Sequence, residues 1–130
     1  MAEAKFVSKP GQIDFTDARY CPVVNTVVTR GGKILLVQRS SQMRLYPNYW
    51  NGISGFLDDN RSIEEKVRDE LREELGIKKT NIAKLKIGNV LIQEAPQYKK
   101  TWLVVPVLAS IKIDKFQLDW EAKAAKWFNP

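Results

Sequence analysis

The 130-residue chain contains no histidine and only one cysteine, Cys21. Without histidine, the Ser-His-Asp and Cys-His mechanisms of nucleophilic catalysis are excluded. Without a cluster of cysteine and histidine ligands, so is a typical zinc site. A single cysteine forms no internal disulfide, and we therefore expect a protein of the reducing cytoplasm. The catalytic groups of any reaction must therefore be carboxylates, hydroxyls, lysine, arginine or a hard metal ion.

Long apolar runs are missing as well. No segment approaches the roughly 18–20 apolar residues that a membrane span needs, and the first residues lack a signal-peptide core. With 44% hydrophobic and 28% charged residues, the composition is that of a globular protein, and we expect a single domain over residues 1–130 and no membrane partner. The net charge of +6 indicates an anionic partner. Because the lysines are scattered, a small phosphate-bearing substrate is favoured over a nucleic acid, which stays possible.

The hydrophobic pattern predicts several strands around one helix. The β-branched run 21–29 and the apolar run 34–40 flank the turn 30–33, which contains two glycines, and are typical of a hairpin. Further extended segments are expected at 53–60, 85–93, 101–113 and 123–128, with loops at 41–52 and 94–100. This order predicts an α+β or mixed α/β fold.

The predicted helix has clear signals at both ends. Ser62 and Glu65 form a capping-box pattern, and Gly76 stands where a C-terminal cap belongs. The positions predicted to form its buried stripe are Ile63, Val67, Leu71 and Leu75.

Three acids lie on or near this buried stripe. At about 100° per residue, Glu74 falls inside the arc of the stripe, Glu70 lies just beyond its edge and Glu73 is farther round on the same side. Buried carboxylates that repel one another require a cation. Spacing alone leaves two candidates open, a network with Arg68 and Arg72 or a hard divalent cation.

The segment 55–77, GFLDDNRSIEEKVRDELREELGI, resembles the Nudix box, G-x5-E-x7-R-E-U-x-E-E-x-G-U with U aliphatic. The matching positions are Gly55, Glu70, Leu71, Glu73, Glu74, Gly76 and Ile77. The flanking ILLVQRS and YPNYW are similar too, so the resemblance covers most of residues 21–128. It implies a Nudix fold, an α/β/α sandwich around a mixed sheet. It also implies a Mg²⁺-dependent pyrophosphohydrolase, with Mn²⁺ as an alternative metal, that cleaves a nucleoside diphosphate linked to another moiety through metal-activated water.

The same resemblance implies the roles of individual residues. Glu70, Glu73 and Glu74 are the expected catalytic metal ligands, and the backbone carbonyl of Ser54 is a further one. An acid from outside the box is usual in the family, and Glu121 is the first candidate. Its alternative role is that of an ordinary surface carboxylate.

Other expected contacts concern the rest of the substrate. Glu94 is the second candidate for the outside acid, and Arg39 matches a position that contacts phosphate or base in the family, although a solvated arginine at a strand end is the alternative. Tyr49 and Trp50 are expected to bind the substrate by stacking, against the alternative of core packing. The other aromatic residues considered for this wall are Tyr46, Tyr98 and Trp102.

The chain departs from the box at two charged positions. Arg61 stands where the first glutamate belongs and Asp69 where the arginine belongs, so the usual ion pair is inverted and its attraction is expected to survive. Ser54 also replaces a frequent glycine. The inverted pair and the basic charge support an alternative function, a non-catalytic Nudix module that binds a nucleotide or RNA as a sensor.

The last residues raise a question about the second face of the sheet. Nudix domains usually follow the late strand with a C-terminal helix, and Asn129-Pro130 is a typical entry into a helix. We therefore expect that helix to be missing and the face to be exposed, which favours a homodimer. The alternative is that residues 1–15 fold across this face.

Overall fold

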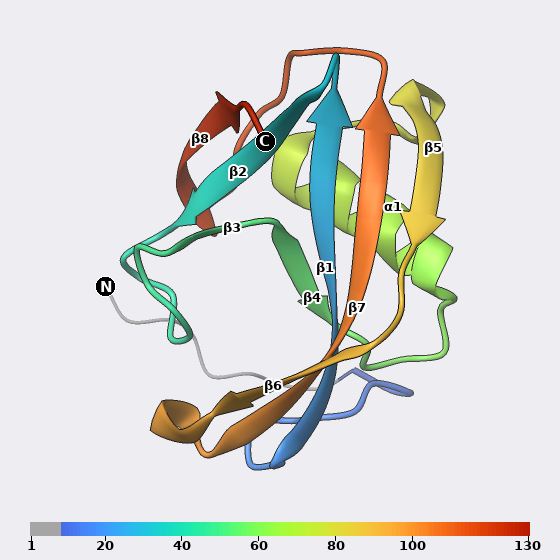
Figure 1. Ribbon diagram of the computed structural model, residues 1–130. Helices are drawn as coiled ribbons and strands as arrows, with labels where there is room; N and C mark the ends of the chain where they lie inside the picture. The colour runs from blue at the N-terminus through green and yellow to red at the C-terminus, as the bar shows by residue number, and fades with distance from the viewer. Residues whose placement is uncertain (1–8) are drawn as a thin grey trace.

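The computed structural model describes residues 9–130 of the chain (Figure 1). The part described contains eight strands, one α-helix and two 3-10 turns. The elements are β1 Tyr20–Arg30, β2 Lys33–Arg39, β3 Trp50–Asn51, β4 Ile53–Phe56, α1 Ile63–Leu75, η1 Lys79–Asn81, β5 Ile82–Ile87, β6 Leu91–Ala95, η2 Pro96–Tyr98, β7 Lys100–Ile111 and β8 Ala122–Phe128. The strands predicted at 21–29, 34–40, 101–113 and 123–128 are confirmed to within two residues at each end.

The run 85–93 was predicted as one extended segment and is two strands. The break follows from Pro106 in the neighbouring β7, which has no N–H to donate to a strand beside it. β5 pairs with β7 from Val107 onward, and β6 pairs with β7 up to Val104. Between them Gly88 donates its N–H to the Pro106 carbonyl at 2.8 Å. The predicted loop 41–52 likewise ends in the short strand β3.

The strands form one mixed sheet with β1 and β7 at its centre. The order is β3-β2-β1-β7-β5, while β4 pairs with β1, β6 with β7 and β8 with β2. β1 and β7 run parallel and side by side, from the pair Tyr20↔Thr101 to the pair Thr29↔Ser110 (Figure 1). β1 pairs with β4 over Val23–Thr26 and with β2 over Val28–Arg30. β4 and β2 therefore pair with successive parts of β1.

Helix α1 covers one face of this sheet and carries the caps that the sequence predicts. The Glu65 N–H donates to Ser62 Oγ at 3.1 Å, and the Ser62 N–H donates to Glu65 Oε1 at 3.1 Å. Gly76 adopts the left-handed conformation with φ 66°. Val67, Leu71 and Leu75 are fully buried against apolar side chains of β1, β2, β4 and β7. This core fixes the helix, and with it the box glutamates, relative to the sheet.

The opposite face of the sheet has no α-helix on it within residues 9–130. Val24 and Val28 of β1 point to the helix side, so Val27 and its partner Leu108 on β7 lie on the other face. Leu108 is 41% exposed. The fold class is therefore confirmed as α+β with a mixed sheet, with a helical layer on one face.

The described N-terminal residues lie beside the start of α1, and they also cover part of this face, as the alternative expected. Phe15 stacks on Phe56 with ring centroids 5.9 Å apart and packs with Trp102 and Val104 of β7, which share the face of Leu108. The Ile13 N–H donates to the Asp58 carbonyl at 2.7 Å, and Gln12 Nε2 donates to Asp58 Oδ2 at 2.8 Å. Residues 1–8, which belong to the same predicted alternative, lie outside the described residues. Over residues 9–130, the helical segments are too short and too polar to cross a membrane.

Candidate active site

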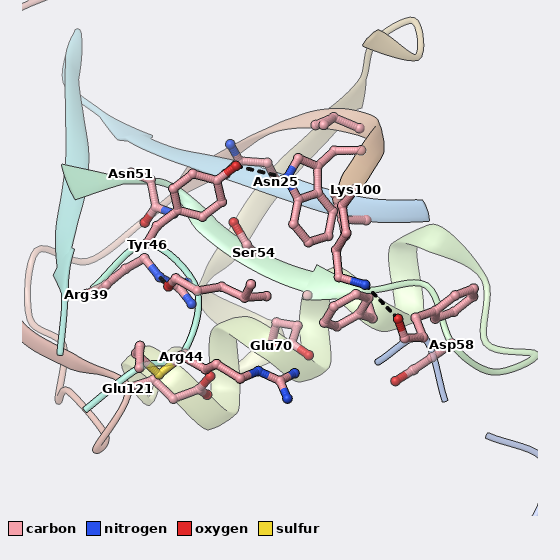
Figure 2. A pocket seen from close by; sticks show the side chains of 18 of the residues that line it. Asn25, Arg39, Arg44, Tyr46, Asn51, Ser54, Asp58, Glu70, Lys100 and Glu121 are labelled. Carbon is pink, nitrogen blue, oxygen red and sulfur yellow. Dashed lines mark hydrogen bonds between the residues drawn. The ribbon is translucent and has the colours of Figure 1, made fainter. Parts of the chain in front are cut away.

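A cavity of about 530 Å³ opens between the first turns of α1, strand β4 and the loop before β3. Figure 2 shows its side chains converging from α1, from β1 and β4, from β7 and from the segment before β8. One end carries Glu70 and Glu73, while the third box acid, Glu74, does not line the cavity, and the other end carries aromatic rings. It contains Glu70, Glu73, Ser54, Glu121, Arg39, Tyr49 and Trp50 of the predicted site residues.

Glu70 lies directly over the backbone of Gly55. A Cβ atom at position 55 would stand 2.9 Å from both Cδ and Oε1 of Glu70, closer than real contacts allow. The glycine of the box is therefore needed because the carboxylate occupies the space of its missing side chain. This packing holds Glu70 against β4, next to the backbone of Ser54.

A buried lysine neutralises Glu70. Lys66 Nζ lies 3.2 Å from Glu70 Oε1 and 3.6 Å from Asp58 Oδ1, and the three side chains are only 8–14% exposed. From the sequence, Arg68 and Arg72 were the expected basic partners, and Lys66 was not among them. The sequence contains a signal for this pair, because Lys66 is four residues before Glu70 and lies between Glu70 and Glu73 on the helical wheel.

Glu74 is buried, as its place within the apolar arc predicts. It is 8% exposed, and among the described residues its Oε2 has no hydrogen-bond partner. Burial raises the pKa of the Glu74 carboxyl far above its ordinary value, and the hydrogen bond to Glu70 and the charges of Glu121, Glu70 and Asp119 raise it further. This shift favours the protonated form of Glu74, and a cation beside it would favour release of the proton.

Glu73 is the exposed member of the three acids. Its side chain is 56% exposed and lies 3.8 Å from Arg72 Nη2. Within residues 9–130, no three acidic side chains lie close enough together to form a ready-made cation cage. The chemistry of the site still fits a hard divalent cation, because its donors are oxygen atoms and one buried carboxylate oxygen of Glu74 has no partner among them.

Glu121 reaches the acid end of the cavity from the turn before β8. Its carbonyl accepts the Ser40 N–H at 2.8 Å, and its charge acts on Glu74. Asp119, which the sequence analysis did not consider, acts on Glu74 as well, and burial raises its own pKa. Glu94 lies elsewhere, 3.5 Å from Arg19 and hydrogen-bonded to Thr101, so the second candidate for the outside acid is not at the cavity.

Arg39 lines the cavity and also holds the loop before β3, which forms one wall of the cavity. Its Nε donates to the Leu45 carbonyl at 2.8 Å, and its backbone exchanges hydrogen bonds with Asn48 and Tyr49. Tyr46 and Asn48 have positive φ angles of 48° and 68°, which non-glycine residues rarely adopt. The loop is therefore a fixed wall, and Arg39 is not the freely solvated strand-end arginine of the alternative.

The aromatic residues divide into a packed group and an exposed group. Trp102 Nε1 donates to the Tyr46 hydroxyl at 2.9 Å, and the Tyr98 hydroxyl accepts the Tyr46 N–H at 2.8 Å. These three rings pack on one another and build the wall. Tyr49 and Trp50 are 61% and 41% exposed and line the cavity, so they are the rings available to a flat ligand.

Lys100 closes the cavity on the N-terminal side. Its buried ammonium group donates to the carbonyls of Phe15 at 2.8 Å, Thr16 at 3.1 Å and Ala18 at 2.8 Å. The Cys21 sulfur is a fourth contact at 3.5 Å. Nothing in the sequence near Lys100 signals this role, because its partners are backbone atoms more than eighty residues away.

Two asparagines also contribute polar atoms to the cavity lining. Asn25 and Asn51 line the cavity, and within the described chain their Oδ1 atoms are buried without a hydrogen-bond partner. Gly52 lies tightly against the first of them, since a Cβ there would stand 2.5 Å from Asn25 Oδ1. These atoms offer hydrogen bonds to a bound ligand.

Comparisons with known proteins agree with this arrangement. The family described as NUDIX domain matches residues 19–130. The mitochondrial NAD(P)H pyrophosphatase NUDT13 of Mus musculus is 39% identical over 112 residues, which cover 83% of this chain and 29% of that protein. The NAD-capped RNA hydrolase NudC of Pseudomonas aeruginosa is 33% identical over 64 residues, which cover 49% of this chain and 22% of that protein. The chain thus spans less than a third of the length of either relative.

A solved structure shows the same fold. The MutT protein of Methanosarcina mazei Go1 superposes with a TM-score of 0.71 at 22% sequence identity. The match covers 85% of this chain and 78% of that one.

Proposed function

Because the chain belongs to the NUDIX domain family, as the match over residues 19–130 shows, we propose that it is a divalent-metal-dependent hydrolase. Its substrate is a nucleoside diphosphate linked to another moiety, and the bond cleaved is the phosphoanhydride. The observation that carries the proposal is Glu74, a buried acid whose Oε2 has no partner in the described structure and whose neighbours at the cavity are further acids. A buried acid in this position costs stability unless a cation compensates it.

The proposed ligands are Glu70, Glu73, Glu74, the carbonyl of Ser54 and Glu121, with Mg²⁺ as the expected ion and Mn²⁺ as the alternative. Such an ion supplies positive charge to phosphate oxygens and lowers the pKa of the attacking water. Glu70 is held in place by Gly55, and Glu74 by the helical core. Glu73, the most exposed of the three, is free to turn toward the cavity or to orient a water molecule.

The other end of the cavity receives the nucleoside. Tyr49 and Trp50 offer exposed rings for stacking, and Arg39 adds a positive charge to the lining. The names of the two relatives, NAD(P)H pyrophosphatase and NAD-capped RNA hydrolase, both refer to a nicotinamide dinucleotide. NADH and NAD-capped RNA are therefore the first substrates to test, and a cytoplasmic location is part of the proposal.

The test is hydrolysis of a substrate panel with Mg²⁺ and with Mn²⁺. The panel contains NADH, ADP-ribose, a dinucleoside polyphosphate, a nucleoside triphosphate and NAD-capped RNA. Glu74→Gln keeps the size of the side chain and removes its charge, so hydrolysis should fall by several orders of magnitude. Glu64→Gln, on the exposed side of the same helix, is the matched control and should retain full activity. Near-normal hydrolysis by Glu74→Gln would show that the box acids are not the catalytic centre.

A second candidate function is a sensor that binds the nucleotide or RNA without cleaving it. The observation in its favour is the ion pair of Glu70 with Lys66, which engages a proposed metal ligand in this structure. Tight binding of a panel member, with no product formed at any metal concentration, would favour the sensor.

A further inference from the structure

Lys66 is unusual because it places a buried positive charge between two acids, Glu70 and Asp58. Its side chain is 8% exposed, and its charged partners are Glu70 at 3.2 Å and Asp58 at 3.6 Å. The other oxygen of Asp58 accepts a hydrogen bond from Gln12. A buried ammonium group is costly unless carboxylates surround it, so Lys66 is held by these two acids.

Other basic side chains of the cavity are held by different partners. Lys100 donates to three backbone carbonyls, and Arg39 donates to the Leu45 carbonyl. Arg72, on the same helix, makes exposed pairs with Asp69 and Glu73. Among these basic residues, Lys66 is the one whose buried ion pair is with Glu70, a box glutamate that lines the cavity.

The contact involves the oxygen that is already fixed in place. Oε1 of Glu70, which Lys66 contacts, is the atom that packs over Gly55. The carboxyl of Glu74 is hydrogen-bonded to Glu70 and has one buried oxygen without a described partner. An ammonium group in contact with Glu70 satisfies that acid, and it repels a second cation that approaches the same carboxylate.

We propose that Lys66 is an internal counter-ion that competes with a divalent cation for Glu70. It stabilises Glu70 and Asp58 when no cation is bound, and it weakens cation binding by the free protein. The inference rests on the proposed function, because it assumes that Glu70 is a metal ligand. Lys66 is a positioning residue in this role, since it acts through Glu70.

The experiment measures Mn²⁺ binding without substrate, by the electron paramagnetic resonance signal of free Mn²⁺. Lys66→Met keeps an unbranched side chain, one heavy atom shorter than lysine, and removes its charge. The Kd for Mn²⁺ should fall by about tenfold or more, because a unit charge in contact with a carboxylate shifts its affinity for cations by this order. Lys66→Arg keeps the charge and should bind Mn²⁺ like the wild type.

Two controls separate this effect from general changes in charge and folding. Arg68→Met removes one positive charge from the same helix outside the cavity and should leave the Kd unchanged. Thermal melts follow folding: Lys66→Met should melt lower than the wild type without Mn²⁺ and gain more from added Mn²⁺. A purely structural role for Lys66 predicts weaker binding instead.

An unchanged or higher Kd in Lys66→Met would overturn the inference, while Mn²⁺ binding by the wild type would leave the proposed function standing. Failure of every variant and of the wild type to bind Mn²⁺ would overturn both. If Lys66→Met does not fold, Lys66→Gln replaces it, and the same comparison with Lys66→Arg decides.

Discussion

At the scale of single residues, the three box acids have three different environments. Glu74 is buried, Glu70 is paired with Lys66, and Glu73 is exposed beside Arg72. The helical wheel predicted this gradient of burial correctly. The wheel did not reveal how the charge of Glu70 is compensated. Arg68 and Arg72 were the expected partners, and Lys66 makes the ion pair instead.

Glu74→Gln should raise the melting temperature of the metal-free protein. The pKa of Glu74 is raised in the folded state above its ordinary value of 4.5, so its protonated form is favoured by folding. The raised pKa of Glu74 does not affect the free energy of unfolding while the pH is below the pKa of the unfolded state. As the pH rises above that value, it lowers the free energy of unfolding progressively. The gain from glutamine should therefore be near zero at pH 4 and largest at pH 8, as measured by thermal melts in a chelator. A variant that melts no higher than the wild type at pH 8 would contradict this assignment, and Glu64→Gln is the control.

At the scale of elements, the start of α1 is tied to the preceding loop by the inverted ion pair. The predicted attraction is confirmed, with Arg61 Nη1 2.8 Å from Asp69 Oδ2. The structure adds a partner that the pattern did not show, because Asp59 accepts hydrogen bonds from Nε and Nη2 of the same guanidinium. Arg61 lowers the pKa of Asp59 to about 2, so this link persists in mild acid.

Arg61→Glu should destabilise the protein by about 1–2 kcal/mol, because it places three partly exposed acids together. Adding Asp69→Arg should restore only part of the loss, since Asp59 still faces the new glutamate. Urea unfolding of the single and double variants measures both steps, with Arg68→Glu as a charge-reversal control. If the effects of the two single changes simply add, residues 61 and 69 do not interact.

The elements that were predictable are those whose signals are local. The helix has its caps and its stripe in one continuous segment, so its bounds followed from the sequence. The break between β5 and β6 depends on Pro106 in β7, and the clamp by Lys100 depends on carbonyls of residues 15–18. Such features arise from contacts between distant segments, which no local pattern contains. The same holds for Asp119, whose role depends on its distance from Glu74 in space.

At the scale of the whole molecule, the uncovered part of the sheet face opposite α1 is a surface suited to association. Leu108 is exposed there, and Val27 lies beside Leu108. Exposed apolar groups on a sheet favour contact with another protein surface. A homodimer through this face remains our prediction.

Light scattering after gel filtration at micromolar concentration should therefore give the mass of a dimer. Leu108→Glu should convert it to a monomer, because a charge at the centre of the face opposes its burial. Glu64→Gln, on the far side of the molecule, should leave the mass unchanged. A wild-type protein that is monomeric at every concentration tested would rule the dimer out.

The parallel pairing of β1 with β7 also determines the order in which the protein assembles. Its partners are about eighty residues apart in the chain, from Tyr20↔Thr101 to Thr29↔Ser110. Pairing over such a separation is slow, since a long loop must close before any contact rewards it. On the ribosome, the hairpin β1–β2 and helix α1 emerge long before β7. The cavity, which takes walls from both halves, therefore comes into being only when the last third of the chain has joined the first.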